Sequence, residues 1–358
     1  MNHSTQKTVS TYKACRASIE FQNIKLSGVY QGWTQLVHHE KSGIAAAIFQ
    51  DKLNSELNLT NVPLAVAKRP FTLPTKIKPF RRWVLSKQRG ASNGQKIRLD
   101  ADLSAEQLIN GNPARISRTD YFSSLCTNEL GLTEIRESIG FGSCRDDAKS
   151  LFDGRSLWLT GEPDWQIKPL DSSDCSNHIG VSTLAISSKG IIPLIRQPSK
   201  SAQSSGLLAP SGSGSLDWQD LAGAQAGPSL TFPKLITYAM DRELREECGL
   251  TPGDLQQTYL VGYARMLHRA GKPEFFGITL LTEQAKLPSN AILIGQNCGC
   301  AQGENAIGIG STADHLWKIL SELEEHCSEA RNGSEVSLIL RLNLSFARAF
   351  VHNNRHLF

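Results

Sequence analysis

The chain has 358 residues, roughly twice the length of a typical domain, so we expect two domains. Its 40% hydrophobic and 20% charged residues exclude wholesale disorder, collagen-like repetition and coiled-coil composition. The 38 Lys and Arg residues exceed the 34 Asp and Glu residues by too little to imply a nucleic-acid partner by themselves.

The sequence contains no recognisable targeting or membrane segment. Residues 1–16 lack the apolar core of a secretory signal peptide. The longest apolar run, residues 43–49, is far shorter than the ~20 residues of a membrane-spanning helix. The eight cysteines are too sparse for a disulfide scaffold, and the close pair Cys298 and Cys300 lacks a second pair at zinc-site spacing. We therefore expect a soluble, cytoplasmic protein with free thiols and no membrane partner.

Residues 68–98 form an unusually basic segment, with ten Lys and Arg residues and no acid. Without these ten, the 38 basic residues fall to 28, against 34 acidic ones. Such a segment could bind a nucleic acid, with Phe71, Phe80 and Trp83 as stacking candidates. Its three prolines are more typical of an extended, solvated connecting segment, and we favour this interpretation.

The first half of the chain predicts a smaller α+β unit. Helical segments are expected over residues 105–110 and 133–138. A polar, proline-containing connector over residues 160–178 is a suitable place for a domain boundary. We therefore divide the chain into an N-terminal α+β domain of unknown role, residues 1–170, and an α/β domain, residues 171–358.

The second half alternates strand and helix patterns. Pro233 suits the first turn of a helix, and Gly249 suits its C-terminal stop. In chain order we expect a hairpin over 179–197, a Gly/Ser/Ala-rich segment over 198–227, a helix over 233–247, strands over 258–267 and 274–282, an amphipathic helix over 314–326 and a strand over 335–346.

Three glutamates share one face of the predicted helix 233–247. Glu243, Glu246 and Glu247 fall within an arc of about 100° at 3.6 residues per turn, so they repel one another unless positive charge neutralises them. Carboxylate oxygens suit a hard divalent ion such as Mg²⁺, which commonly also binds substrate phosphates. Arg242 lies one turn before Glu246 and can orient it through an i,i+4 pair.

The segment RELREECGL, residues 242–250, resembles the second half of the signature of the Nudix hydrolases, Arg-Glu-apolar-x-Glu-Glu-x-Gly-apolar. All the specified positions match, and a chance match is on the order of one in ten thousand. The resemblance implies a Nudix-type α/β/α sandwich with a mixed sheet. It also implies that Glu243, Glu246 and Glu247 bind Mg²⁺, or alternatively Mn²⁺, with Glu246 and Glu247 catalytic. Arg242 and Gly249 would be structural.

The front half of the signature departs from the family pattern. Counting back from the arginine, the first-glycine position holds Pro228 and the first-glutamate position holds Lys234. Asp217 or Asp220 is a candidate replacement for the missing carboxylate, and the alternative is that both cap local turns.

The segment APSGSGSLDW, residues 209–218, resembles a variant of the glycine-rich loop of the family. Gly212 and Gly214 stand in place of its paired glycines, and the resemblance implies that they bind substrate.

A narrower resemblance is to the Nudix group that includes UDP-sugar diphosphatases, and it covers roughly residues 100–345. It rests on the altered signature, the preceding TDYFSSLCTNE and the stretch GYARMLHRAGKPEFFG. Basic side chains are then candidate contacts to a diphosphate, because Arg forks match phosphate oxygens. These are Arg196, Arg265, Arg269 and Lys272. Glu274 is a candidate general base or extra metal ligand, and the alternative is a surface carboxylate at a strand end.

The sequence thus predicts a metal-dependent hydrolase that cleaves the pyrophosphate of a nucleoside diphosphate linked to another moiety, such as a UDP-sugar, by attack of a metal-activated water. An alternative is a Nudix-fold module that binds a nucleotide or a partner without turnover, which Lys234 favours. A third possibility is nucleic-acid binding through residues 68–98. The first domain is expected to cover the active site or to form a homodimer surface.

Overall fold

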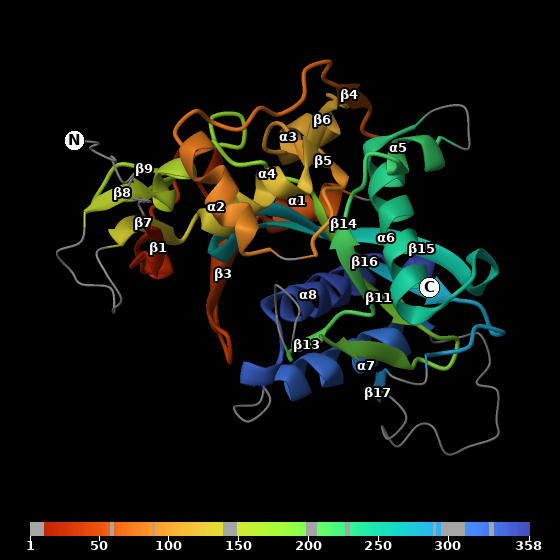
Figure 1. Cartoon of the computed structure of the whole chain (residues 1–358). Coiled ribbons are helices and arrows are strands. Elements are labelled where there is room, and N and C mark those ends of the chain that lie inside the picture. Colours follow the sequence, from red (N-terminus) through yellow and green to blue (C-terminus); the bar gives the residue numbers. More distant parts are fainter. Residues whose placement is uncertain are drawn as a thin grey trace, which may run out of the picture.

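Figure 1 shows a computed structural model of the chain, a mixed α/β protein, which confirms the predicted α/β class. The residues that the structure describes are 11–57, 61–88, 90–138, 149–197, 206–225, 230–288, 291–294, 312–328 and 333–358. Within them, a six-stranded mixed sheet is accompanied by four smaller sheets.

The central sheet joins strands from both halves of the chain. Its strands, in spatial order, are β14 (Gly212–Ser215), β11 (Gly180–Ile186), β16 (Lys272–Leu281), β15 (Leu255–Met266), β3 (Gly43–Phe49) and β2 (Thr34–Glu40). β11 and β16 run parallel, and the other neighbours are antiparallel. The division at residues 170 and 171 stays a prediction, but two strands of this sheet come from residues 34–49.

Helices cover both faces of the central sheet. A Cβ at Gly277 would lie 2.5 Å from the sulfur of Met240 in α6 (Phe232–Cys248), and one at Gly262 would lie 2.2 Å from the ring of Phe346 in α8 (Leu338–Asn353). Gly262 pairs with Phe276, the neighbour of Gly277, so the two glycines point to opposite faces. Because β11 and β16 are covered on both sides, almost all of their residues are buried.

The helix that carries the glutamates begins and ends as predicted. Pro233 lies in the first turn of α6, where a missing N–H does not matter. Gly249 ends the helix in the left-handed conformation, with φ 66°, which glycine adopts without strain. The predicted strands over 258–267 and 274–282 are confirmed as β15 and β16, and the helix over 314–326 as α7 (Thr312–Ser328).

The predicted strand over 335–346 is wrong, because this segment begins α8. Its alternating leucines follow the period of a strand, but the helix is buried on most sides between the sheet and α7, so the alternation has no structural meaning. The Oγ of Ser337 accepts a hydrogen bond from the amide of Leu340 at 3.2 Å and caps the first turn.

The predicted helix over 133–138 is also wrong, because this segment forms β7 (Thr133–Ser138). β7 is the middle strand of a sheet with β1 (Thr11–Arg16) and β8 (Ser150–Asp153), and Ile135 is its buried residue. One apolar residue gives no periodicity from which to choose between helix and strand. The predicted helix over 105–110 is confirmed as α3 (Ala105–Ile109).

The predicted hairpin over 179–197 is correct in its strands and wrong in their pairing. The amide of Ser187 donates to the carbonyl of Ile191 at 3.0 Å, so the turn forms. β11 is already flanked by β14 and β16, so it has no free edge with which β12 (Ile192–Arg196) could pair. β12 instead forms a separate sheet with β13 (Leu208–Ala209) and β17 (Ile292–Ile294).

The basic segment 68–98 is more structured than an extended connector. It contains a helical turn over Lys78–Phe80, helix α2 (Arg81–Ser86) and strand β5 (Gln95–Leu99). β5 forms a sheet with β6 (Ala114–Asp120) and β4 (Leu64–Val66).

The aromatic residues of this segment already have protein partners. Phe80 is buried, Phe71 lies 5.3 Å from the guanidinium of Arg98, and Trp83 lies against Tyr12 and under the ammonium of Lys87. Their rings are therefore not freely presented for base stacking.

The remaining expectations concern cysteines and membranes. Cys126, Cys175, Cys248 and Cys327 are free and buried. Cys15 is disulfide-bonded, so the expectation of free thiols throughout is wrong. Cys298 and Cys300 lie outside the described residues. Among the helices that the structure describes, none has the length and apolar character needed to cross a bilayer.

Candidate functional site

Helix α6, which carries Glu243, Glu246 and Glu247 and is called the acidic helix below, lies along the edge strand β14. The amide of Ser213 donates to Oε2 of Glu247 at 3.0 Å, and the amide of Ser215 donates to Oε1 of Glu243 at 3.1 Å. Both amides point outward from an edge strand and have no strand partner, so the two carboxylates satisfy them. Glu246 points to solvent, with 60% of its side chain exposed.

Two glycines of β14 allow this close approach. A Cβ at Gly214 would lie 2.1 Å from the carboxylate of Glu243, and one at Gly212 would lie 2.7 Å from the backbone of Leu244. These positions therefore leave room for α6 itself, and the role in substrate binding predicted for Gly212 and Gly214 stays a prediction.

Arg242 lies at the centre of the acidic residues. Its Nε and Nη2 donate to the two carboxylate oxygens of Asp220 at 2.8 and 3.0 Å, its Nη1 donates to Glu243 at 2.9 Å, and Nη2 also donates to the carbonyl of Ser215. The predicted pair with Glu246 is present at 3.4 Å. Arg242 thus positions α6 against β14.

Asp220, in helix α5 (Asp220–Gly223), is the aspartate that binds Arg242. It is 2% exposed and makes both hydrogen bonds of the bidentate pair. Asp217 lies farther away, with 3.6 Å between its carboxylate and Arg242, and its main partner is Lys96. Of the two candidates for the missing carboxylate, the structure brings Asp220 into direct contact with the signature helix.

The carboxylates of α6 lie where negative charge is unfavourable. Burial raises the pKa of Glu247 to about 7, and the neighbouring charges of Glu243 and Glu246 act in the same direction, against the hydrogen bonds to Ser213. Burial likewise raises the pKa of Glu243, although Arg242 opposes the shift. The negative charge of this face is therefore only partly compensated.

These residues fit a hard divalent cation by chemistry, since every donor is a carboxylate oxygen. Among the described residues, no group of three or more His, Cys, Asp or Glu side chains is already arranged to hold a metal ion. Glu243 and Glu247 are turned to the amides of β14 and Glu246 to Arg242. Metal binding would require at least one of them to exchange its present hydrogen bond for the ion.

Glu274 is buried, so the alternative of a surface carboxylate is wrong. It is 2% exposed, and its Oε2 accepts a hydrogen bond from Nζ of the buried Lys272 at 2.7 Å. The pair lies over Gly180, where a Cβ would be 1.9 Å from Oε2 of Glu274. Ser182 donates to the other oxygen at 3.4 Å.

The register of the sheet connects this pair to the acidic helix. Gly180 of β11 lies opposite Ser215 of β14 on one side and opposite Glu274 of β16 on the other. Two strand spacings place the Cα atoms of Ser215 and Glu274 about 10 Å apart. The amide of Ser215 holds Glu243, so both groups of charged residues lie at one end of the same sheet. Glu274 projects from the face opposite α6, because its neighbour Phe275 packs against Phe232 of α6.

Arg265 is not brought to the acidic helix. It is fully buried, and its guanidinium donates to Asp102 at 2.8 Å, to the hydroxyl of Tyr30 and to the carbonyl of Gly271. Its charge is neutralised inside the protein, so its predicted contact with a diphosphate is replaced by a structural role.

Arg196 is also remote from the acidic helix. It lies in β12, outside the central sheet, and donates to the carbonyl of Gly206 at 2.8 Å, with Glu335 at 3.7 Å. The diphosphate contact predicted for it is therefore not supported by its position.

Two residues near this end of the sheet were missed by the sequence analysis. Lys96 forms an ion pair with Asp217. Burial, followed by the charges of Lys272 and Arg269, lowers the pKa of His178. Lys96 was hidden among ten basic residues of one segment. It reaches the site because β5 bridges Asp217, a contact between distant parts of the chain that no local pattern announces.

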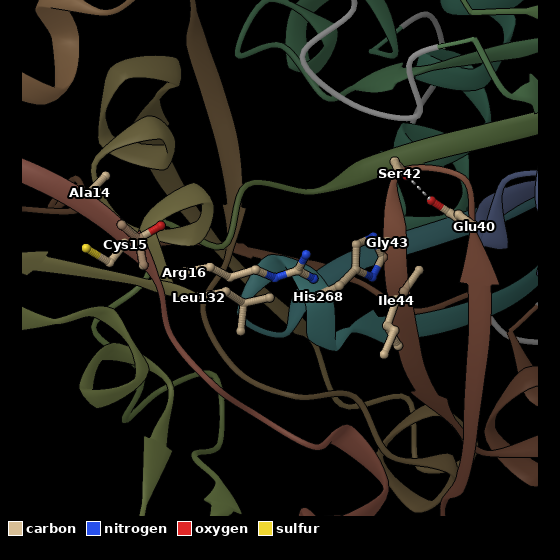
Figure 2. Close-up of a pocket in the computed structure, with 11 residues that line it drawn as sticks. Ala14, Cys15, Arg16, Glu40, Ser42, Gly43, Ile44, Leu132 and His268 are labelled. Carbon is tan, nitrogen blue, oxygen red and sulfur yellow. Dashed lines mark hydrogen bonds between the residues drawn. The ribbon is translucent and has the colours of Figure 1, made fainter. Parts of the chain in front are cut away.

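A pocket of about 360 Å³ lies elsewhere, between β1, β7 and the turn from β2 to β3. Figure 2 shows the guanidinium of Arg16 beside His268, and no residue of α6 lines this pocket. Its one carboxylate, Glu40, already accepts hydrogen bonds from Ser42 and from the amide of Leu338. We therefore place the chemistry at α6 rather than here.

No family model matches the chain, and no curated protein matches it. The resemblance of residues 242–250 and the contacts around α6 are therefore the observations that point to a function.

Proposed function

We propose that the protein is a Mg²⁺-dependent hydrolase of the Nudix type, which cleaves the pyrophosphate bond of a nucleoside diphosphate linked to another moiety, such as a UDP-sugar. One observation carries the proposal. Glu243 and Glu247 accept hydrogen bonds from β14, Glu246 lies beside them in contact with Arg242, and Arg242 is fixed there by the buried Asp220. A helix has little reason to gather three partly compensated carboxylates unless they bind a cation.

The fold supports the same proposal at a coarser level. α6 and α8 lie on opposite faces of a mixed sheet, as a Nudix-type α/β/α sandwich requires. Asp220 supports the proposal further. Lys234 stands where the family signature has a glutamate, and Asp220 gives Arg242 a carboxylate partner in its place. Lys234 is exposed in the first turn of α6.

Each residue then has a role. Glu246 and Glu247 would hold Mg²⁺ or Mn²⁺, with Glu243 completing the site, and the bound ion supplies an activated water and neutralises phosphate oxygens. Arg242 orients the helix. Glu274, held by Lys272, is our candidate for the general base, because buried carboxylates aligned by a second group are suited to accept a proton.

A second candidate function is a nucleotide-binding module without turnover. The observation that favours it is the engagement of Glu243 and Glu247 with backbone amides, which leaves Glu246 as the exposed carboxylate of the three. In that case a nucleotide would bind without being cleaved. We also propose that the protein is cytoplasmic and forms a homodimer.

The test is hydrolysis of UDP-glucose, ADP-ribose, NADH and nucleoside triphosphates, followed by phosphate release after phosphatase treatment. Each substrate is measured with Mg²⁺ and with a chelator, for the wild type and for Glu247→Gln. Glu325→Gln, an exposed glutamate of α7, is the matched control. We expect Mg²⁺-dependent turnover of one substrate that Glu247→Gln abolishes and Glu325→Gln leaves unchanged. Nucleotide binding without turnover by the wild type would favour the binding module instead.

A further inference from the structure

His178 is a buried imidazole surrounded by positive charge. It is 4% exposed, and in the described part of the chain its Nδ1 has no hydrogen-bond partner. Burial, followed by the charges of Lys272, Arg269 and Lys96, lowers the pKa of His178 well below its ordinary value. The ring is therefore neutral at pH 7, and each neutral imidazole carries one N–H that can donate a hydrogen bond.

Two further buried polar groups of the described residues have no hydrogen-bond partner, and one of them belongs to Asn177, which precedes His178 in the chain. They are Oγ of Ser124 and Nδ2 of Asn177, and both are buried. The amide of Asn177 donates to the side chain of Asn128 at 2.9 Å, which fixes residue 177 against the segment that follows Ser124. Buried donors without partners commonly indicate a place for water, an ion or a ligand.

The three cations around His178 are each paired with one acid, and none is saturated. Nζ of Lys272 donates to Glu274, and Nζ of Lys96 donates to Asp217. An ammonium group has three N–H donors, so each lysine retains two for another acceptor. Arg269 binds Glu129 through Nε and Nη2, and its Nη1 is not used in that pair.

β5 brings Lys96 from the basic segment into this group. The amide of Ile97 donates to the carbonyl of Leu216 at 3.1 Å, and the carbonyl of Ile97 accepts from the amide of Ile179 at 2.9 Å. The carboxylate of Asp217, the partner of Lys96, is also 3.6 Å from Arg242. Lys96 therefore lies between the acidic helix and His178.

We propose that Lys96, His178 and Lys272 form the subsite for the diphosphate of the substrate, with Arg269 beside them, so that the first half of the chain completes the active site. The nature of the substrate rests on the proposed function. The register of β11 and β16 sets His178 beside Lys272, and β5, which carries Lys96, bridges His178 at Arg98. Unused lysine N–H groups next to a neutral imidazole suit a group with several anionic oxygens. Glu243, Glu246 and Glu247 of α6 would hold a metal ion, which would supply positive charge to neutralise phosphate oxygens.

The subsite is tested by calorimetric titration of inorganic pyrophosphate into the whole protein, in the presence of a chelator. Metal-free binding is measured so that the result does not depend on turnover. We expect Lys96→Met and His178→Gln each to weaken binding about tenfold or more, as the loss of a charge-assisted hydrogen bond of about 1.5 kcal/mol implies. Lys96→Arg should restore most of the affinity.

The control is Lys87→Met, an exposed lysine of the same basic segment that lies over Trp83. It should leave pyrophosphate affinity unchanged within about twofold. Thermal unfolding of each variant identifies any that does not fold.

Unchanged affinity in folded Lys96→Met and His178→Gln, or no pyrophosphate binding by the wild type, would overturn the subsite. Binding that depends on Lys96 in a protein that hydrolyses nothing would support the subsite and reject the hydrolase. With a substrate that is turned over, Lys96→Met should raise KM by about tenfold and change kcat little, because the contact is made before the chemical step.

Discussion

Asp220 and Arg242 form a bidentate ion pair, with Nε–Oδ1 and Nη2–Oδ2 distances of 2.8 and 3.0 Å, and Asp220 is almost completely buried. The pair links α5 to the signature helix across 22 positions of sequence. It fixes the rotation of α6 and therefore which residues of the helix face β14. The orientation of Glu243 and Glu247 depends on this pair.

Replacement of Asp220 by Asn should therefore destabilise the protein. Removal of one partner from a buried ion pair leaves the other charge uncompensated, and we expect a loss of about 3 kcal/mol in the free energy of unfolding, measured by urea denaturation. Asp217→Asn is the control, because Asp217 is partly exposed and should cost less than about 1 kcal/mol. Equal effects of the two variants would show that the buried pair is not the determinant.

Gly214→Ala should disturb the acidic site without changing any carboxylate. The new Cβ would lie 2.1 Å from the carboxylate of Glu243, so either Glu243 or the helix must move. We expect a loss of about 1–3 kcal/mol of stability and weaker Mg²⁺ binding, measured by calorimetry. Gly253→Ala is the matched control, since its Cβ would lie 3.9 Å from its nearest neighbour, Thr251. Wild-type Mg²⁺ affinity in Gly214→Ala would argue against Glu243 as a ligand.

The sequence predicted α6 well because its signals are local. The proline in its first turn, its C-terminal glycine and its charged face all lie within residues 232–249. The strand predicted over 335–346 failed for the opposite reason. Leucines at alternate positions indicate a strand when one face is solvated, but α8 is buried on most sides, so burial between α7 and the sheet overrode the alternation.

The candidate site could be predicted from sequence only where its residues are neighbours along a helix. Glu243, Glu246 and Glu247 were found in this way, whereas Lys96 and His178 meet through the pairing of β5 with residues far along the chain. Arg265 was misassigned because an arginine within a predicted strand gives no sign of whether its side chain is buried. Its ion pair with Asp102 is set by tertiary packing.

Replacement of Arg265 tests whether its role is structural. Arg265→Met leaves the carboxylate of Asp102 without its partner in the interior, and we expect a loss of about 3–5 kcal/mol in the free energy of unfolding. Pyrophosphate affinity of the folded fraction should stay near that of the wild type, because the guanidinium does not face the acidic helix. If Arg265→Met is stable but no longer binds pyrophosphate, Arg265 contacts the substrate after all.

The contribution of His38 to stability should fall as the pH is lowered from 7.5 to 5.5, while Glu247, whose pKa is raised, contributes in the opposite direction. Burial lowers the pKa of His38, whose Nδ1 accepts from Arg341 at 2.9 Å and whose Nε2 donates to the carbonyl of Val336 at 2.8 Å. The unfolded chain has the ordinary pKa of 6.5 and binds a proton first, so stability is complete above that value and is lost as the pH falls through it. Urea unfolding at several pH values measures the effect.

In His38→Gln the loss of stability with falling pH should be smaller, because one buried neutral imidazole has been removed. His352→Gln, at an exposed position near the end of α8, should leave the pH dependence of the wild type unchanged. If His38→Gln keeps the full dependence on pH, other groups account for it.

Glu274→Gln separates the role of this carboxylate in catalysis from its role in the fold. The amide keeps the size of the side chain and can still accept a hydrogen bond from Lys272, so we expect a folded protein. If Glu274 accepts the proton of the attacking water, kcat should fall by about 10²–10⁴ with little change in KM, measured on the substrate that the wild type hydrolyses.

Ser182→Ala is the control for this variant, since it removes only the weak 3.4 Å contact to the same carboxylate. A comparable fall in kcat for both variants would indicate that the position of β16, rather than the basicity of Glu274, limits the reaction. A fall confined to Glu274→Gln would connect the buried pair over Gly180 to the chemistry at α6, because the register of β14, β11 and β16 is what brings them to one end of the sheet.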